Sequence, residues 1–322
     1  MCANVVGEAG RIAKETAVAL CWTQWSGMGA MAVPVESRRA QSIVDPEALV
    51  LLSLFVSKEE RRLGDLVAWW ARTGSNLTSV HRLKIVASKF PGEVSSDELP
   101  LFALLAAEAG DRRWRGSAGG TVPEWVRSQK GPAALELIEP SALWPRLRAG
   151  FGVGAKADAL VFLLGLRGGW ASAKVISFAT GYSTVAVRQA VGEMALARLI
   201  RETGGRPSEY LAPSKPWETL LGFHDCGNGG STSGASPKWC FWADLFAFLA
   251  EVMAWSRSAD STASPSVRLV ASQARDLMEA HSEAFRLNDI GVPPPELFKG
   301  RAGVEGLLKT VETVSTWARE HV

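Results

Sequence analysis

Apolar residues recur at helical spacing along the first part of this 322-residue chain. Asp45 followed by Pro46 is typical of a helix start, because a carboxylate caps free amides and proline fits the first helical turn. Ser57 and Glu60 have the spacing of a capping box before another helix. The pattern therefore predicts a helical N-terminal region, residues 1–142, with helices over residues 47–55, 61–72, 79–89 and 95–109.

The last third of the chain shows the same periodicity. Residues 110–145 and 227–234 are rich in Gly, Pro or Ser and are expected to be irregular. Ser236 and Pro237 predict the start of a helix that carries several aromatic residues. We expect a helical C-terminal region, residues 216–322, with further helices over residues 264–285 and 304–321.

The pattern changes in the centre of the chain, over residues 143–215. Two short helices are predicted over residues 157–164 and 173–180, and the turn Gly181-Tyr182-Ser183 leads into a third helix over residues 184–195. Two alternating segments then flank Gly204-Gly205, which indicates a β-hairpin. This order of elements is that of a winged helix-turn-helix with the hairpin as wing. The predicted fold class is mainly α, with this motif between two helical regions.

Charge separates the centre from its flanks. The whole chain has a net charge of only +2, yet residues 143–215 hold ten basic and four acidic residues. The N-terminal region is balanced, and the C-terminal region has an acidic excess. A basic surface attracts phosphates, so the pattern favours double-stranded DNA as the partner of the central region.

The third central helix divides into two faces. Its inner face is expected to pack with Leu199 and Ile200 of the wing through Val187, Ala190, Val191 and Met194. Arg188 and Gln189 lie on the outer face, where bidentate contacts to guanine and adenine are chemically suited to them. An exposed polar helix face without base reading is the alternative interpretation.

Other central residues are suited to the DNA backbone. The second helix is predicted to begin at Ala171 or Ser172, where free amides can hold a phosphate with help from neighbouring side chains. Arginines at the wing tip suit the minor groove or a phosphate, although a hairpin with solubilising charges remains open. The predicted DNA-binding residues are Lys174, Tyr182, Ser183, Thr184, Arg188, Gln189, Arg201 and Arg206.

Residues 147–156 and 179–183, with the hairpin after them, resemble the winged-helix regions of bacterial transcriptional regulators. Residues 44–52 and 59–63 also resemble a group of largely uncharacterised bacterial proteins that join a helical N-terminal region to such a motif. Some of that group are encoded beside predicted nucleotidyltransferases, so the resemblance implies an antitoxin or an autoregulator. The chain departs from the pattern at Arg198, where such regulators often have glycine after the recognition helix.

The sequence offers little support for catalytic or metal chemistry. Residues 150–156 lack the spacing of a phosphate-binding P-loop. His224, Cys226 and Cys240 lack a fourth zinc ligand at the usual spacing, and the four histidines form no recognisable catalytic constellation. We expect no enzyme activity, no cofactor and no metal site.

The expected location is the cytoplasm. Four cysteines without a C-x-x-C pair do not indicate a disulfide framework. Residues 17–33 superficially resemble a signal peptide, but Glu8 and Glu15 stand where basic residues would be expected. No segment has the roughly 18 uninterrupted apolar residues of a membrane-spanning helix.

These patterns together favour a sequence-specific DNA-binding regulator of transcription. Its flanking helices are expected to support a homodimer, which would bind a palindromic operator, or to bind a protein partner. Two alternatives remain: a winged-helix adaptor that binds protein without reading DNA, and an unrecognised enzyme in a flanking region.

Overall fold

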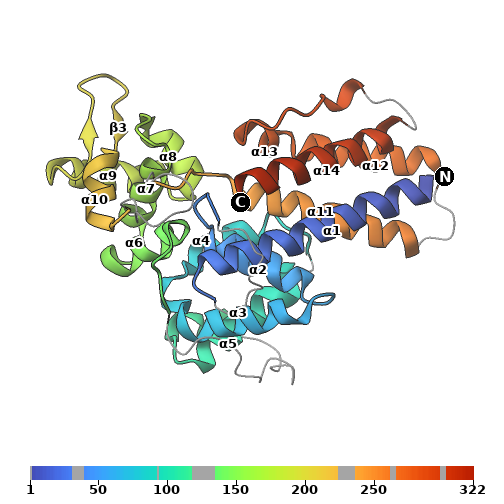
Figure 1. The fold of residues 1–322 in the computed structure, drawn as a ribbon, viewed down its shortest axis with the longest axis horizontal. Coiled ribbons are helices and arrows are strands. Elements are labelled where there is room, and N and C mark those ends of the chain that lie inside the picture. Colours follow the sequence, from blue (N-terminus) through green and yellow to red (C-terminus); the bar gives the residue numbers. More distant parts are fainter. Residues whose placement is uncertain are drawn as a thin grey trace, which may run out of the picture.

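The computed structural model describes residues 2–30, 40–92, 94–117, 135–223, 236–261, 266–297 and 302–322. The described chain is mainly helical and contains one small antiparallel sheet. Figure 1 shows a large group of helices and, at one end of it, a smaller unit with a projecting β-hairpin. The predictions for residues 227–234, His224 and Cys226, and part of residues 110–145, lie outside the described residues.

The larger part, here called the helical body, comprises the described residues of 2–117 and 240–322. Its N-terminal segment forms α1 (Cys2–Gly27), α2 (Pro46–Val56), α3 (Arg61–Thr73), α4 (Val80–Ala87) and α5 (Leu99–Glu108), with a π-helical turn (Val94–Glu98) before α5. Its C-terminal segment forms α11 (Trp242–Ser261), α12 (Val267–Ala280), α13 (Ser282–Leu287) and α14 (Ala302–His321). Both segments contribute to a single apolar core.

Helix α1 joins the two segments of the helical body, because it packs against both α11 and α14. Thr16 of α1 donates a hydrogen bond to Ser315 of α14 over 2.8 Å, between positions 299 residues apart in the chain. At Gly10, an added Cβ would lie 2.3 Å from the Ser256 hydroxyl, so the absence of a side chain permits the close approach of α1 and α11. The N- and C-terminal regions are therefore one structural unit.

The smaller part, here called the central unit, comprises residues 143–223. It contains α6 (Leu143–Phe151), α7 (Ala155–Gly165), β1 (Ala171–Ser172), α8 (Ala173–Thr180), α9 (Thr184–Leu196), β2 (Arg201–Glu202), β3 (Glu209–Leu211) and α10 (Ser214–Leu221). The sheet order is β1-β3-β2, and both pairings are antiparallel. Trp217 and Phe223 are buried in the second core of the chain, so this unit continues beyond the boundary expected at residue 215.

One predicted cap and two predicted helix bounds differ from the structure, although α3 begins at Arg61 as predicted. Ser57 caps the C-terminus of α2, and the carboxylate of Glu60 instead caps α3 by accepting from the Arg62 amide. Ser236 and Pro237 lie in an extended segment whose Lys238 pairs with Ser42, so α11 begins later, at Trp242. The continuous helix expected over residues 264–285 is interrupted at His281.

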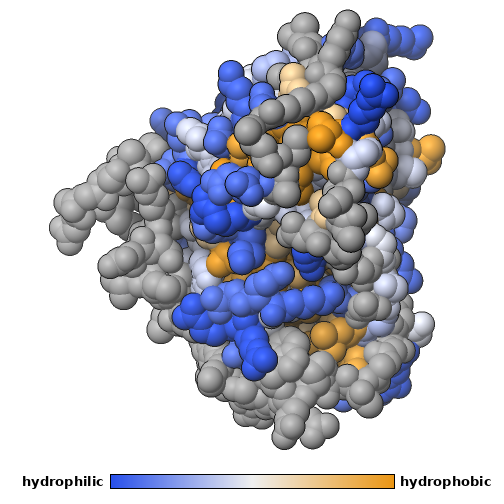
Figure 2. Space-filling model, turned by 90° about the vertical axis from the view of Figure 1, so that its right-hand side faces the viewer, coloured by the Kyte–Doolittle hydropathy of each residue, from blue (hydrophilic) through white to orange (hydrophobic). Residues whose placement is uncertain are grey.

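The end of the helical body farthest from the central unit has a mixed surface. Figure 2 shows hydrophilic side chains over much of this end, with apolar groups between them. None of the helices in the described ranges is both long enough and apolar enough to cross a membrane.

Candidate nucleic-acid interface

Local capping explains why α8 and α9 form as two helices. The Ser172 hydroxyl accepts from the Val175 amide at the start of α8, and the Ser183 hydroxyl accepts from the Ala186 amide at the start of α9. Between the helices, Gly181 has a φ of 79°, a left-handed conformation that glycine adopts without a Cβ clash. The predicted bounds of α8 are confirmed, and α9 extends one residue further than predicted.

The inner face of α9 is confirmed. Val187, Ala190, Val191 and Met194 are each at most 4% exposed, and Val187, Val191 and Met194 belong to the core of the central unit. Ile200 is also buried, and Leu199 packs against the same core. The orientation of α9 follows from this packing, which leaves Arg188 and Gln189 exposed.

The outer face of α9 contains a carboxylate as well as basic groups. Gln189 Nε2 donates to Glu193 Oε1 over 3.0 Å, and Lys156 Nζ lies 2.5 Å from Glu193 Oε2. The hydrogen bond from Lys156, followed by that from Gln189, lowers the pKa of Glu193. Gln189 must therefore exchange an intramolecular bond for any contact with a base, whereas Arg188 forms no such bond with the described residues.

The hairpin lies beside the outer face of α9. Burial and the charge of Glu202 raise the pKa of Tyr210 in β3, and the positive charge of Arg188 opposes this shift. Arg201 and Arg206 of the hairpin are exposed, and neither forms an ion pair within the described part of the chain. Exposed arginines of the helix and the hairpin thus belong to neighbouring surfaces.

Arg198 follows α9, at the position where winged-helix regulators often have glycine. Its φ of 58° is in the left-handed region, so the backbone here has the conformation for which glycine is favoured. The chain keeps this turn with an arginine, whose side chain is exposed. The turn into the hairpin therefore needs no glycine to form, although a non-glycine residue is strained in it.

Lys174 and Tyr182 do not lie together. Lys174 is exposed in the first turn of α8, whereas Tyr182 follows the opposite end of this helix, roughly 12 Å away at 1.5 Å per residue. Tyr182 is half-buried, and its ring lies 6.3 Å from that of His81 in α4. Burial, and then the negative charge of Asp158, raise the pKa of Tyr182. Its side chain therefore lies at the contact between the central unit and the helical body, away from the start of α8.

The raised pKa of Tyr182 predicts a loss of folding stability at alkaline pH. In the unfolded chain, the Tyr182 phenol ionises near pH 10, whereas the folded protein favours its protonated form. The resulting stabilisation is complete below about pH 10 and is lost as the pH rises toward the folded pKa. We expect Tyr182→Phe to lose less unfolding free energy than the parent between about pH 9.5 and 11 in urea denaturation. Parallel pH profiles for the two proteins would contradict this.

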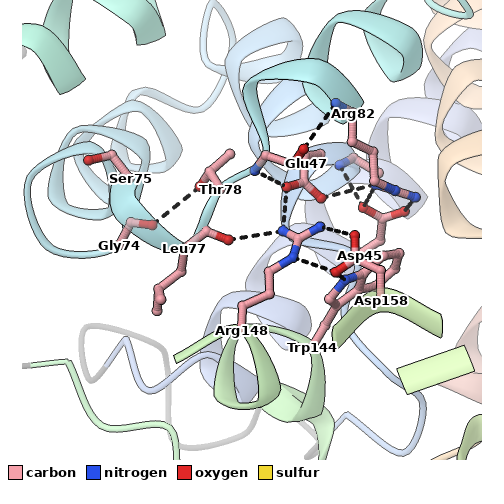
Figure 3. A network of polar contacts seen from close by, with 12 residues as sticks. Asp45, Glu47, Gly74, Ser75, Leu77, Thr78, Arg82, Trp144, Arg148 and Asp158 are labelled. Carbon is pink, nitrogen blue, oxygen red and sulfur yellow. Dashed lines mark hydrogen bonds and ion pairs between the residues drawn. The ribbon is translucent and has the colours of Figure 1, made fainter. Parts of the chain in front are cut away.

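A buried ion-pair network connects the central unit to the helical body (Figure 3). Arg148 of α6 binds both carboxylate oxygens of Asp158 of α7, over 2.8 Å each, and its Nη1 lies 2.5 Å from Glu47 of α2. Glu47 also accepts from Arg82 of α4 over 3.0 Å. All four side chains are at most 6% exposed. The network therefore joins charged groups of both structural units.

The remaining polar groups of the network are also satisfied. Arg82 binds Asp45 in a bidentate arrangement, over 2.6 and 2.7 Å, and its guanidinium carbon lies 4.3 Å from the centroid of the Trp144 ring. The Trp144 indole donates to Asp158 over 2.8 Å. Burial opposes the charge of Arg148, but Asp158 and Glu47 outweigh this effect and raise its pKa. The buried charges are thus matched by close partners, as low polarity requires.

This network was not predicted from the sequence. Glu47 and Asp158 are single carboxylates within strongly apolar helical runs, which is the signal that would have indicated burial. Arg148 is one of the ten basic residues of the centre, but its charge is neutralised inside the protein. Removing Arg148 and Asp158 from the surface count leaves nine basic and three acidic residues, so the excess of six is unchanged.

Metal ligation has no support from the described residues, among which no group of three or more His, Cys, Asp or Glu side chains is placed to hold an ion. Cys240 is buried, and burial raises the pKa of its thiol to about 12.

Comparison with known proteins found no matching family model, no similar curated protein and no similar solved structure.

Proposed function

We propose that the central unit is a winged helix-turn-helix that binds double-stranded DNA and that the protein regulates transcription. The observation that carries this proposal is a set of exposed arginines on α9 and the adjacent hairpin, Arg188, Arg201 and Arg206, which form no ion pair with the described residues. These elements lie at the end of the molecule away from the helical body (Figure 1). Their exposure at this end makes them accessible to the phosphates of a DNA duplex.

In this proposal, each exposed element has a separate role. The outer face of α9 enters the major groove, where Arg188 contacts base edges. Arg201 and Arg206 of the hairpin bind the phosphates or the minor groove next to it. Ser183 and Thr184, at the start of α9, lie where a recognition helix approaches the DNA, and Lys174 is placed to bind a phosphate at the start of α8.

The proposal predicts a strong dependence of DNA affinity on salt. Each phosphate neutralised by a basic side chain releases counterions, so three or four such contacts should give a slope of about −2.7 to −3.6 in a plot of log K against log salt concentration. Fluorescence anisotropy with a random-sequence duplex measures this slope. A flat dependence, or no binding at low salt, would contradict DNA binding. Sedimentation of the protein with a palindromic duplex tests the expected homodimer, which requires two chains on that duplex.

A second candidate function is a protein-binding adaptor without DNA reading. The supporting observation is a set of apolar side chains that α8 and α9 expose, with Val175, Phe178 and Val185 each 48–73% exposed. Exposed apolar groups are more typical of protein contacts than of phosphate contacts. The salt experiment separates the two candidates, because the adaptor predicts no affinity for the duplex even at low salt.

A further inference from the structure

A recess lies where the central unit meets the helical body, with a volume of about 230 Å³. It is separate from the outer face of α9 and from the hairpin tip, and none of the proposed DNA contacts lines it. Its apolar wall is formed by Ile85 of α4, Phe178 and Ala179 of α8, Trp239 and Phe241 of the segment before α11, and Ala243 of α11 itself.

The size of the recess suits a small molecule. An apolar cavity of about 150 Å³ is large enough to bind benzene, so about 230 Å³ can hold a bicyclic ring system. Two aromatic side chains lie next to each other in its wall, because the ring centroids of Phe178 and Phe241 are 6.1 Å apart. Phe178 is nevertheless 54% exposed, and a bound ring would cover part of this surface.

The charged groups of the recess indicate that its ligand is neutral. Asp45 and Arg82 bind each other, and the Lys89 ammonium lies 2.7 Å from the Asp244 carboxylate. The thiol of Cys240 is kept protonated by burial, which raises its pKa to about 12. The wall therefore offers no unpaired charge among its described residues, and a charged ligand would lose hydration without gaining a partner.

We infer that this recess binds a neutral aromatic molecule of about two fused rings. The ligand contacts α8 of the central unit and α4 of the body at the same time, so it stabilises the observed arrangement of the two units. Binding to the folded protein alone raises its thermal stability by mass action. The inference goes beyond the proposed DNA binding and does not depend on it.

Equilibrium dialysis with 2-naphthol, carried out without DNA, tests the inference. We expect saturable binding of one molecule per chain, a higher melting temperature, and much weaker binding of the anion 2-naphthoate. Phe178→Ala should weaken the affinity for 2-naphthol about three- to tenfold, the range of an aromatic contact. Val175→Ala is the matched control, because Val175 is similarly exposed on α8 but does not line the recess.

Three outcomes would overturn the inference: no binding of 2-naphthol, equal affinity for 2-naphthoate, or equal losses in the two variants. Thermal melts of both variants show whether either has lost its fold. Since the dialysis contains no DNA, its result is independent of the duplex titration. A protein that binds 2-naphthol but not DNA would refute only the proposed function.

Discussion

Arg148→Ala is expected to lower the free energy of unfolding by about 3–5 kcal/mol, the usual cost of removing one partner from a buried ion pair. The substitution leaves the carboxylates of Glu47 and Asp158 buried without their shared guanidinium. It also leaves the Leu77 carbonyl without the donor that lies 2.9 Å away. Urea denaturation followed by circular dichroism measures the loss.

Arg146→Ala provides the matched control for this prediction. Arg146 is on the same helix, α6, but is only partly buried, and its guanidinium carbon lies 5.7 Å from the centroid of the Phe223 ring. Removing a cation–π contact of this kind costs about 0.5–1 kcal/mol. Equal losses in the two variants would show that the network has no special role. A denaturation curve with two steps for Arg148→Ala would show that the central unit and the helical body unfold separately.

Arg188→Ala is expected to cost about 1–3 kcal/mol of binding free energy at a preferred DNA site and to relax the preference there. The reason is that its side chain is exposed on the outer face of α9, opposite the buried positions. Arg206→Ala should instead weaken binding to all sequences and flatten the salt slope by about one unit. Each variant would be compared with the parent on a selected duplex and on a scrambled one.

Arg268→Ala controls for the loss of one positive charge. Arg268 is exposed on α12 in the helical body, so its replacement should leave both affinity and sequence preference unchanged. Equal, sequence-independent losses for Arg188→Ala and Arg206→Ala would make Arg188 a phosphate contact only. Unchanged binding in both variants would mean that neither α9 nor the hairpin faces DNA.

The elements of the proposed interface could be predicted because their signals are local. Ser172 and Ser183 cap helices that begin one residue later, and Gly181 supplies the left-handed turn between them. The spacing of Val187, Ala190, Val191 and Met194 also determined which face of α9 is buried, since residues three and four apart share one side of a helix. These features depend on neighbouring residues alone. Whether that face binds DNA stays a prediction.

Caps and boundaries were predicted less well where two signals compete over a few residues. Ser57 and Glu60 have the spacing of a capping box, and the helix begins at Arg61 as predicted, but Ser57 caps the end of α2 and only Glu60 caps α3. Ser236 and Pro237 resemble a helix start, but the backbone there is extended and Lys238 pairs with Ser42. In the second case, a pairing with a segment almost two hundred residues earlier in the chain outweighed the local preference. Local signals contain no information on such pairings.

The sequence by itself thus determined the mainly helical class, the elements of the centre and the inner face of α9. Only the tertiary structure decided that the N- and C-terminal regions share one core, because α1 finds its partners, α11 and α14, more than two hundred residues further along the chain. Only the tertiary structure decided that Arg148 is internal. A charged side chain is stable inside a protein when opposite charges from other elements meet it there, and periodicity along one helix does not encode where those elements will pack.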